Sequence, residues 1–300
     1  MLRMAFYDQI AANQRRTYLL VLAFLVLLAF LGYVLGIVYG NRYFGLFLAL
    51  GMGLLYFLFS YYAGASAILA MTRAQEATKP EYTHLINTVE GLALAAGLPK
   101  PPKAYVIDDS ALNAFASGRN PAHSVIAVTT GLLKKMNKLE LEGVLAHEMS
   151  HIKNYDIRVM MLAAVMVGTT VLLSDFLLRS FWYGGHGNRR GKGGGAVLLL
   201  VAVALAVLAP LIGELIKLAI SRQREFLADA SAVQLTRYPQ GLANALRKIK
   251  DDPDPLVDYA NKATAHLFIS SPFRKSSVAF RNLFSTHPPL DIRIKRIEAR

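Results

Sequence analysis

The 300-residue sequence lacks cysteine entirely, and its 20 acidic residues are outnumbered by 33 lysines and arginines, for a formal net charge of +13. Without cysteine no disulfide framework can form, which fits a chain that faces the cytoplasm. The basic excess comes with no nucleic-acid-binding motif, so we expect no nucleic-acid partner. In a chain that is 54% hydrophobic, the basic residues instead predict attraction to anionic lipid and loops biased to the cytoplasm.

Charge is absent from two long N-terminal stretches. Residues 19–39 and 43–71 contain no charged side chain, and each exceeds the length of about 20 residues that spans a bilayer. A secretory signal peptide is excluded, because its apolar core would be shorter and a second span would not follow so closely. We therefore predict that residues 1–71 form a transmembrane hairpin.

Two further apolar runs lie downstream. Residues 159–178 contain a single charged residue, Asp175, and residues 196–213 contain none. Their length and apolarity favour a second membrane hairpin over residues 159–218, whereas the alternative is a pair of buried helices in a soluble domain. The favoured interpretation gives four membrane spans and a multi-pass membrane protein.

The distribution of lysine and arginine predicts the orientation in the membrane. Residues 72–158 carry 10 and residues 219–300 carry 14, against 1 in residues 40–43, so the positive-inside rule places the first two segments in the cytoplasm. The loop at 179–195 carries 4 and departs from the rule. Either this loop is translocated or the second hairpin is re-entrant, and the length of the two apolar runs favours translocation.

The pattern H-E-x-x-H at residues 147–151 points to the chemistry. Positions four apart share one face of a helix, so His147 and His151 can direct two imidazoles at one zinc ion. Glu148 then lies where a carboxylate can accept a proton from the attacking water. The pattern is typical of a zinc hydrolase, most often a peptidase.

The helix that carries this pattern has its own signals. Asn137 precedes Glu140 with the spacing of a capping box, which predicts the start of the helix. Gly143 lies one turn before His147, where a missing side chain lets another backbone or a substrate come close.

A catalytic zinc site takes three protein ligands and leaves one position open, so a third ligand must come from elsewhere in the chain. The best candidate follows the fourth apolar run, where Glu225 and Asp229 lie four residues apart on one predicted helix face. That spacing suits a zinc ligand together with a carboxylate that holds a ligand histidine by its other ring nitrogen. On its own, however, the pair is more typical of a solvated charged helix.

Taken together, these segments resemble the HtpX-type membrane zinc proteases, relatives of the CAAX-processing prenyl-protein proteases. The resemblance covers essentially the whole chain and rests on A-H-E-M-S-H-I-K-N-Y-D at 146–156, S-R-Q-R-E-F-L-A-D at 221–229, N-A-F-A-S-G at 113–118, V-I-A-V-T-T-G-L-L at 125–133 and T-H-P-P at 286–289. It implies one Zn²⁺ per chain with His147, His151 and Glu225 as ligands. It further implies Glu148 as the catalytic base and Asp229 as the carboxylate that holds a ligand histidine.

The resemblance also implies the fold and its division into domains. It implies a gluzincin-like α+β zinc-peptidase domain, mainly helical with a small sheet, fused to a polytopic α-helical membrane region of four spans. Residues 72–158 and 219–300 form the two halves of the catalytic domain, and the hairpins at 1–71 and 159–218 form the membrane region. A hairpin between the halves returns the third ligand to the side of the membrane that holds the motif helix.

Residues 104–107 and 124–130 predict strands, with the segment 113–118 between them. Zinc peptidases hold an extended substrate as a strand added to a sheet edge. By the resemblance, Asn113 and Ala114 contact that substrate, whereas the residues alone would indicate an ordinary loop asparagine.

His287 precedes Pro288-Pro289 in a short loop ahead of a basic helix. The resemblance places this segment near the zinc, where His287 donates to the developing oxyanion. A structural loop histidine is the equal alternative.

The sequence thus predicts a zinc endopeptidase of the inner (cytoplasmic) membrane, with its site on the cytoplasmic face. The resemblance implies quality control and a stress response, with misfolded or damaged membrane proteins and unfolded polypeptides as substrates. One alternative is a processing protease for lipid-modified peptides, which needs a large enclosed membrane chamber for which four spans are too few. Another is a transporter or structural protein with a structural zinc, which leaves Glu148 without a role. The oligomeric state is not set by the sequence.

Overall fold

The computed structural model describes residues 41–161, 222–253 and 288–299, together with scattered positions between 15 and 36. The chain divides into two compact units, composed of residues 1–14, 63–161 and 220–300 and of residues 15–62 and 162–219. The metal-site residues described below belong to the first of these units. The domain boundaries drawn from the apolar runs stay a prediction.

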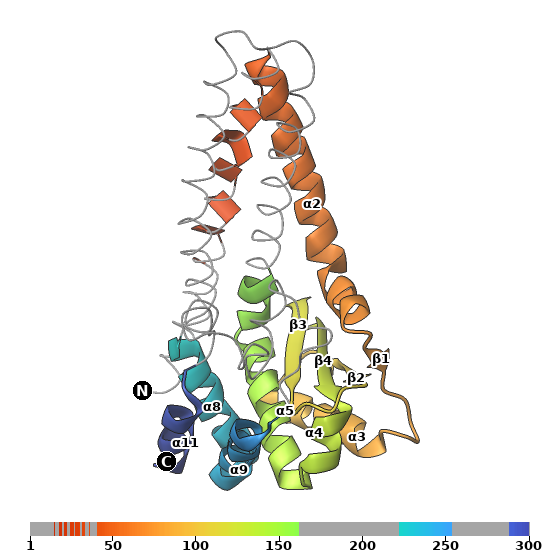
Figure 1. Cartoon of the computed structure of the whole chain (residues 1–300), viewed down its shortest axis with the longest axis vertical. Helices are drawn as coiled ribbons and strands as arrows, with labels where there is room; N and C mark the ends of the chain where they lie inside the picture. Colours follow the sequence, from red (N-terminus) through yellow and green to blue (C-terminus); the bar gives the residue numbers. More distant parts are fainter. Residues whose placement is uncertain are drawn as a thin grey trace. The chain divides into compact units, whose positions relative to one another are not determined.

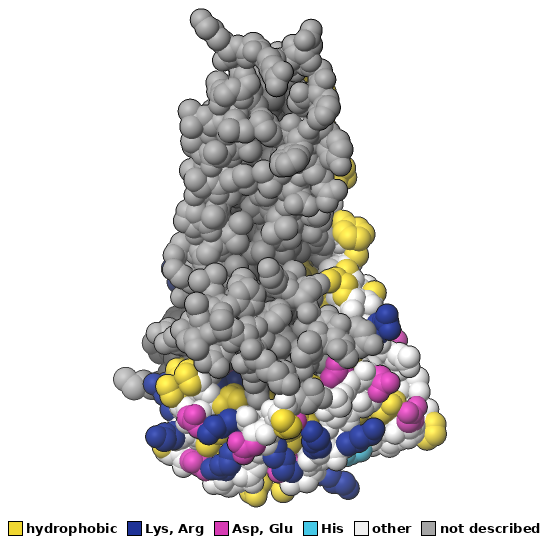
Figure 2. All heavy atoms as spheres, viewed as in Figure 1, with side chains coloured by type: hydrophobic (Ala, Val, Ile, Leu, Met, Phe, Trp, Pro, Cys, Tyr) yellow, Lys and Arg dark blue, Asp and Glu magenta, His cyan; other side chains and the backbone are white. Residues whose placement is uncertain are grey.

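Helix α2 (Arg42–Met71) covers the second apolar run. Its window Arg42–Phe59 has a mean hydropathy of 1.6 over 18 residues, which makes it the one candidate membrane span within the described residues. The helix exposes large hydrophobic side chains, with Phe47 70% and Leu55 69% exposed, and Figure 2 shows hydrophobic side chains on this part of the surface. An apolar surface of this kind is typical of contact with lipid or another protein.

The other predicted spans are not tested. The run at 19–39 is described only at scattered positions, and the second hairpin lies outside the described residues from 162 onward. The count of four spans therefore stays a prediction.

A four-stranded mixed sheet lies in the first unit, with strands β1 (Gln75–Glu76), β2 (Lys103–Ile107), β3 (Ala114–Asn120) and β4 (His123–Thr129) in the order β1-β2-β4-β3. Strands β2 and β4 run parallel, with Lys103 opposite Val125, whereas β3 runs antiparallel to β4, with Ala114 opposite Val128. The strands predicted from the sequence are confirmed as β2 and β4. The segment between them forms β3 and lies at the edge of the described sheet.

Helices make up most of the described part of this unit, and besides the end of α2 they include α3 (Thr83–Ala96), α4 (Thr130–Lys135), α5 (Lys138–Lys153), α8 (Arg222–Thr236), α9 (Pro239–Asp251) and α11 (Leu290–Glu298). Helix α5 contacts α8, α9 and β3, and lies between the sheet and the C-terminal helices in Figure 1. Its Val144, Leu145 and Met149 are fully buried. The described part is therefore a mainly helical domain with a small mixed sheet, as predicted.

Local chemistry fixes where α5 begins and how closely it packs. The side chain of Asn137 accepts from the Glu140 backbone N–H at 2.9 Å and the Glu140 carboxylate accepts from that of Asn137 at 2.8 Å, which confirms the capping box. A Cβ on Gly143 would lie 2.6 Å from the backbone nitrogen of Leu242 in α9. Gly143 thus allows the backbone of α9 to come close, whereas the sequence had allowed either another backbone or a substrate at this position.

Candidate metal centre

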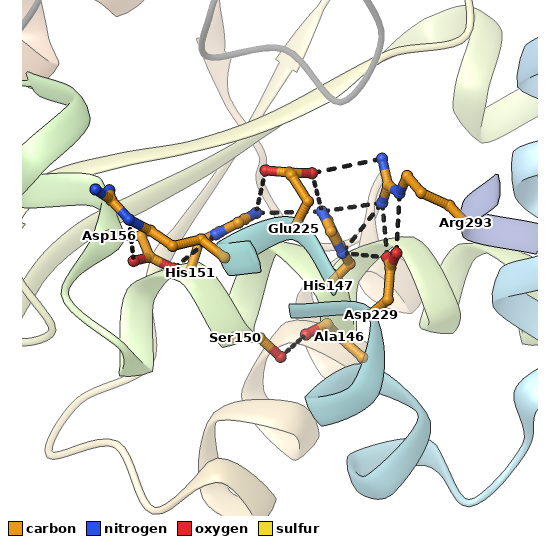
Figure 3. A network of polar contacts seen from close by, with 9 residues as sticks. Ala146, His147, Ser150, His151, Asp156, Glu225, Asp229 and Arg293 are labelled. Atoms are coloured by element: carbon orange, nitrogen blue, oxygen red, sulfur yellow. Dashed lines mark hydrogen bonds and ion pairs between the residues drawn. The ribbon is translucent and has the colours of Figure 1, made fainter. Parts of the chain in front are cut away.

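Helix α5 presents two histidines toward one point. Nε2 of His147 and Nε2 of His151 lie 3.2 Å apart, as expected for positions four apart on one helix face. The rings are nearly perpendicular, at 89°, and the two side chains are buried (Figure 3). Two imidazole nitrogens therefore converge at a buried point.

The first turn of α8 supplies a third donor. The carboxylate of Glu225 places Oε2 3.6 Å from Nε2 of His147 and Oε1 3.5 Å from Nε2 of His151. Glu225 is 5% exposed, and one ligand atom from each of the three residues lies within 4.8 Å of the others. Packing of α8 on α5 thus closes the sequence gap between Glu225 and His151.

The donor set and its spacing fit zinc. Imidazole nitrogen and carboxylate oxygen are common zinc ligands, and tetrahedral bonds of about 2.0–2.1 Å separate neighbouring donors by roughly 3.3 Å. The two imidazole nitrogens lie 3.2 Å apart, and each has one oxygen of the Glu225 carboxylate at 3.5 or 3.6 Å, distances close to that value. Three protein ligands leave one coordination position for water or substrate, the pattern of catalytic rather than structural zinc sites.

Glu148 follows His147 directly on α5 and is 3% exposed. Its negative charge contributes to the raised pKa of His151, so its carboxylate lies within electrostatic range of the ligands. A buried carboxylate beside three metal donors is suited to accept and return a proton.

Behind His147 stands a carboxylate–arginine pair. Nδ1 of His147 lies 3.0 Å from Oδ1 of Asp229, one turn after Glu225 on α8. Asp229 in turn contacts Arg293 of α11 through both of its oxygens, at 2.7 and 3.0 Å. The predicted contact between Asp229 and a ligand histidine is therefore present (Figure 3).

His151 has a matching support. Its Nδ1 lies 3.0 Å from Oδ2 of Asp156, just beyond the end of α5. Nε of Arg224, next to Glu225, lies 3.8 Å from the other oxygen of Asp156. In both histidines, Nδ1 faces away from the three metal donors and contacts a buried carboxylate. Such a contact fixes the orientation of the ring in metal sites.

Burial and charge set opposite protonation for the two histidines in the metal-free site. Burial, and then the charge of Arg293, lower the pKa of His147 to about 4 despite its contact with Asp229. Burial also acts against the charged form of His151, but the hydrogen bond to Asp156 and the charge of Glu225 raise its pKa to about 9. His147 is therefore neutral near neutral pH, whereas His151 carries a proton that a metal must displace.

The pKa values of Asp229 and Arg293 are shifted in opposite directions. Burial acts to raise the pKa of Asp229, but the charge of Arg293 and the contact with His147 lower it to about 2. Burial acts to lower the pKa of Arg293, and the charge of Asp229 outweighs it and raises that pKa above its ordinary value. The two side chains thus remain an ion pair at neutral pH.

The remaining predicted site residues lie on or beside the sheet, or outside the described part. Asn113 and Ala114, where β3 begins, are 2% and 1% exposed. The backbone N–H of Asn113 donates to Oγ1 of Thr129 at 3.1 Å, and its side-chain oxygen accepts from the N–H of Ala114 at 3.1 Å. Their contact with substrate stays a prediction, and His287 lies outside the described residues.

Three site residues were missed by the sequence analysis: Asp156, Arg224 and Arg293. Arg293 had a usable signal, because it falls on the apolar stripe of α11 formed by Leu290, Ile294 and Ile297, where a charge needs a buried partner. Asp156 and Arg224 gave no such signal, since both follow ordinary polar segments.

Comparison with known proteins adds to this geometry. The family model described as Peptidase family M48 matches residues 79–300. Relatives described as "Protease HtpX homolog" include that of Dictyoglomus thermophilum, 46% identical over 295 residues and covering 97% of this chain and 94% of its own length. That of Streptococcus pneumoniae is 44% identical over 299 residues (97% and 99%), and that of Thermoanaerobacter pseudethanolicus is 43% identical over 302 residues (100% and 99%). A solved structure of S. mikatae Ste24p is 20% identical with a TM-score of 0.45, over 81% of this chain and 58% of that chain.

Proposed function

The chain belongs to peptidase family M48 and is a zinc metallopeptidase that hydrolyses peptide bonds, and from this premise we propose that it is a membrane-embedded endopeptidase of protein quality control. Its substrates are misfolded or damaged membrane proteins, and its site faces the cytoplasm. The proposal rests on one observation: three buried metal donors on α5 and α8, arranged as in a catalytic zinc site, occur in a chain that also exposes the apolar helix α2.

His147, His151 and Glu225 would hold the zinc ion. When bound, zinc supplies Lewis-acid chemistry, which makes water more acidic and polarises a carbonyl group. Glu148 accepts the proton of the attacking water and returns it to the departing amine. Asp229 and Asp156 keep the ligand imidazoles turned toward the metal. A purely structural zinc site, by contrast, would leave Glu148 without a role.

The edge of the sheet supplies the substrate-binding element of the proposal. Strand β3 is the edge strand of the described sheet and packs against α5, the helix that carries the two histidines. An extended substrate added beside β3 is held by main-chain hydrogen bonds, which accept many sequences. Asn113 and Ala114 would contact it at the start of β3, and His287 would donate to the oxyanion. Tolerance of sequence suits an enzyme that removes damaged proteins.

The membrane part of the proposal rests on α2 and on the distribution of charge. The exposed apolar surface of α2 is suited to lipid. The lysines and arginines concentrated in residues 72–158 and 219–300 favour the cytoplasm for both halves of the catalytic domain. In this proposal the hairpins at 1–71 and 159–218 anchor that domain to the inner membrane.

Substrate trapping tests this function. Glu148→Gln, expressed in native membranes, should bind zinc but not cleave, because only the proton acceptor is lost. It should therefore retain bound substrates, which cross-linking and mass spectrometry identify. We expect membrane proteins, enriched after a stress that damages them.

A matched control lies on the same helix. Glu142→Gln removes an identical charge from α5 at a half-buried position and should cleave normally and trap nothing. Recovery of only soluble, folded proteins with Glu148→Gln would contradict the quality-control proposal and leave the zinc peptidase chemistry intact.

A further inference from the structure

Arg293 is fully buried on the C-terminal helix α11. Its Nη2 lies 2.7 Å from Oδ1 of Asp229 and its Nε lies 3.0 Å from Oδ2, so one guanidinium occupies both carboxylate oxygens. Oδ1 of Asp229 lies 3.0 Å from Nδ1 of His147. We propose that Arg293 is a positioning residue of the metal site, which fixes the Asp229 carboxylate and, through it, holds the imidazole of His147 in the orientation that binds zinc. This inference rests on the zinc-peptidase function given above.

The geometry of the contact explains why an arginine stands here. A carboxylate that is hydrogen-bonded through one oxygen can rotate about the Cβ–Cγ bond. A planar guanidinium that binds both oxygens fixes the angle of that rotation. The fixed Oδ1 of Asp229 then accepts from Nδ1 of His147 in one direction only. Donation from Nδ1 leaves the lone pair of Nε2 free for a metal.

Arg293 supports the histidine without taking its metal-binding nitrogen. Nη2 of Arg293 lies 3.3 Å from Nε2 of His147 and 3.4 Å from Nδ1. A donor in line with the lone pair of one ring nitrogen would be much farther from the other nitrogen. The near equality of the two distances therefore places Nη2 out of line with Nε2, which remains directed toward His151 and Glu225.

The same guanidinium reaches a second metal ligand. Nη1 of Arg293 lies 3.5 Å from Oε2 of Glu225, one turn before Asp229 on α8. Arg293 thus links α11 to two successive turns of α8 and to the first histidine of α5. Figure 3 shows Arg293 between Asp229 and Glu225. Because Arg293 is buried with these anions, its loss would leave Asp229 without its charged partner and free to turn.

A plain structural ion pair would make a different prediction. Such a pair would stabilise the fold with or without zinc, and its removal would leave zinc affinity unchanged. A positioning residue must instead change zinc affinity, and must do so only while Asp229 is present to transmit its effect. The experiment therefore measures zinc affinity with and without Asp229.

Zinc affinity of the full-length, detergent-solubilised protein provides the test, measured by competition with a chromogenic chelator. All variants carry Glu148→Gln to prevent proteolysis. Arg293→Gln should weaken zinc binding roughly 10- to 100-fold, the usual effect of removing an outer support of a ligand histidine. Arg293→Lys should recover only part of the loss, because one ammonium group cannot span both oxygens of Asp229.

The control and the double variant separate positioning from general damage. Arg296→Gln removes the same charge from the same helix at an exposed side chain that lies 3.8 Å over the ring of Phe226, and should bind zinc like the background. Asp229→Asn combined with Arg293→Gln should bind zinc within about 2- to 3-fold of Asp229→Asn alone, because the arginine acts through the aspartate. Losses that multiply instead would overturn the proposal.

Thermal unfolding gives a second, independent readout. Zinc should raise the melting temperature of Arg293→Gln by less than it raises that of Arg296→Gln, since ligand stabilisation follows affinity. Equal increments, or unchanged affinity, would make Arg293 a structural ion pair only. If Arg293→Gln does not fold, Arg293→Lys decides by the same measurements. A background protein that binds no zinc would overturn the metallopeptidase function together with this inference, whereas tight binding in both background and Arg293→Gln overturns the inference alone.

Discussion

Nδ1 of His151 lies 3.0 Å from Oδ2 of Asp156, a carboxylate five residues further along the chain and beyond the end of α5. Between them Tyr155 has a φ of +60°, which turns the chain where the helix has ended. His147 has an equivalent contact, but its partner Asp229 comes from α8. The two ligand histidines are therefore held by the same kind of group, one from the adjoining segment of the chain and the other from a distant helix.

Removal of the Asp156 charge should weaken the metal site without abolishing it. Asp156→Asn keeps the size of the side chain but loses the charge that supports His151, so we expect zinc affinity to fall roughly 10- to 100-fold. Asp229→Asn should have an effect of similar size through His147. Chelator competition measures both, with Asp251→Asn at an exposed position of α9 as the control. Wild-type affinity in Asp156→Asn would show that its hydrogen bond is incidental.

Zinc binding should release protons near neutral pH. The pKa of His151 is raised from 6.5 to about 9, so this side chain is protonated at neutral pH in the metal-free protein and must lose its proton to become a ligand. The pKa of His147 is lowered to about 4, so it has no proton to lose. We expect about one proton released per zinc ion from the histidines.

Isothermal titration of zinc in buffers of different ionisation enthalpy measures this release. Asp156→Asn should release fewer protons, because the group that raises the pKa of His151 is weakened. The raised pKa of His151 also makes the stability of the metal-free protein depend on pH. The stabilisation that His151 contributes is complete below about pH 6.5 and is lost as the pH rises through about 9. Binding heats that do not depend on the buffer would contradict the raised pKa.

The sequence predicts α5 and its ligands well because their determinants are local. The capping box of Asn137 and Glu140 sets the start of the helix, and the four-residue spacing sets the shared face of His147 and His151. The strands β2 and β4 follow from alternating and β-branched residues in the same way. Such features need no knowledge of distant contacts.

Contacts between distant segments were harder to predict. Arg293 lies on an apolar stripe that signals burial, but nothing in the sequence names Asp229 as its partner, since that depends on how α11 packs on α8. The contact of Asp156 with His151 is preceded by Tyr155 at a positive φ, a conformation that is uncommon for a residue other than glycine. The resemblance to a known family was needed to choose Glu225, because an acidic pair on a helix is common on solvated surfaces.

Glu225 should be indispensable for metal binding, unlike the residues behind the histidines. Its two carboxylate oxygens lie 3.5 and 3.6 Å from the imidazole nitrogens of His151 and His147, respectively, so Glu225→Ala leaves two ligands where a catalytic site needs three. We expect loss of stoichiometric zinc, measured by metal analysis after dialysis, whereas Glu148→Gln should keep it. Normal zinc content in Glu225→Ala would show that another residue is the third ligand.

His287 should affect turnover rather than metal content. If it donates to the oxyanion, His287→Ala should lower kcat by roughly 10²- to 10³-fold with zinc occupancy intact. Cleavage of a fluorogenic peptide, together with metal analysis of the same sample, tests this. A lower melting temperature with unchanged kcat would instead identify a structural loop histidine.

The side of the membrane on which the site lies decides which proteins the enzyme can reach. Because the native chain has no cysteine, single cysteines are clean probes for a membrane-impermeant maleimide. Leu94 on α3 is 83% exposed and belongs to the predicted cytoplasmic half, whereas Ser117 in the same half is 1% exposed and would react poorly. Leu94→Cys should therefore resist labelling in intact cells and react after lysis.

Two further cysteines complete the topology test. Asn41→Cys, in the turn of the predicted first hairpin, is exposed and should react without lysis. Gly194→Cys tests the loop at 179–195, whose four basic residues depart from the positive-inside rule. Labelling from outside supports four spans, whereas protection until lysis means that the second hairpin is re-entrant. Labelling of Leu94→Cys in intact cells would invert the orientation and overturn cytoplasmic quality control, but the zinc chemistry of His147, His151 and Glu225 would stand, because it depends on the packing of α5 against α8 and not on the side of the membrane.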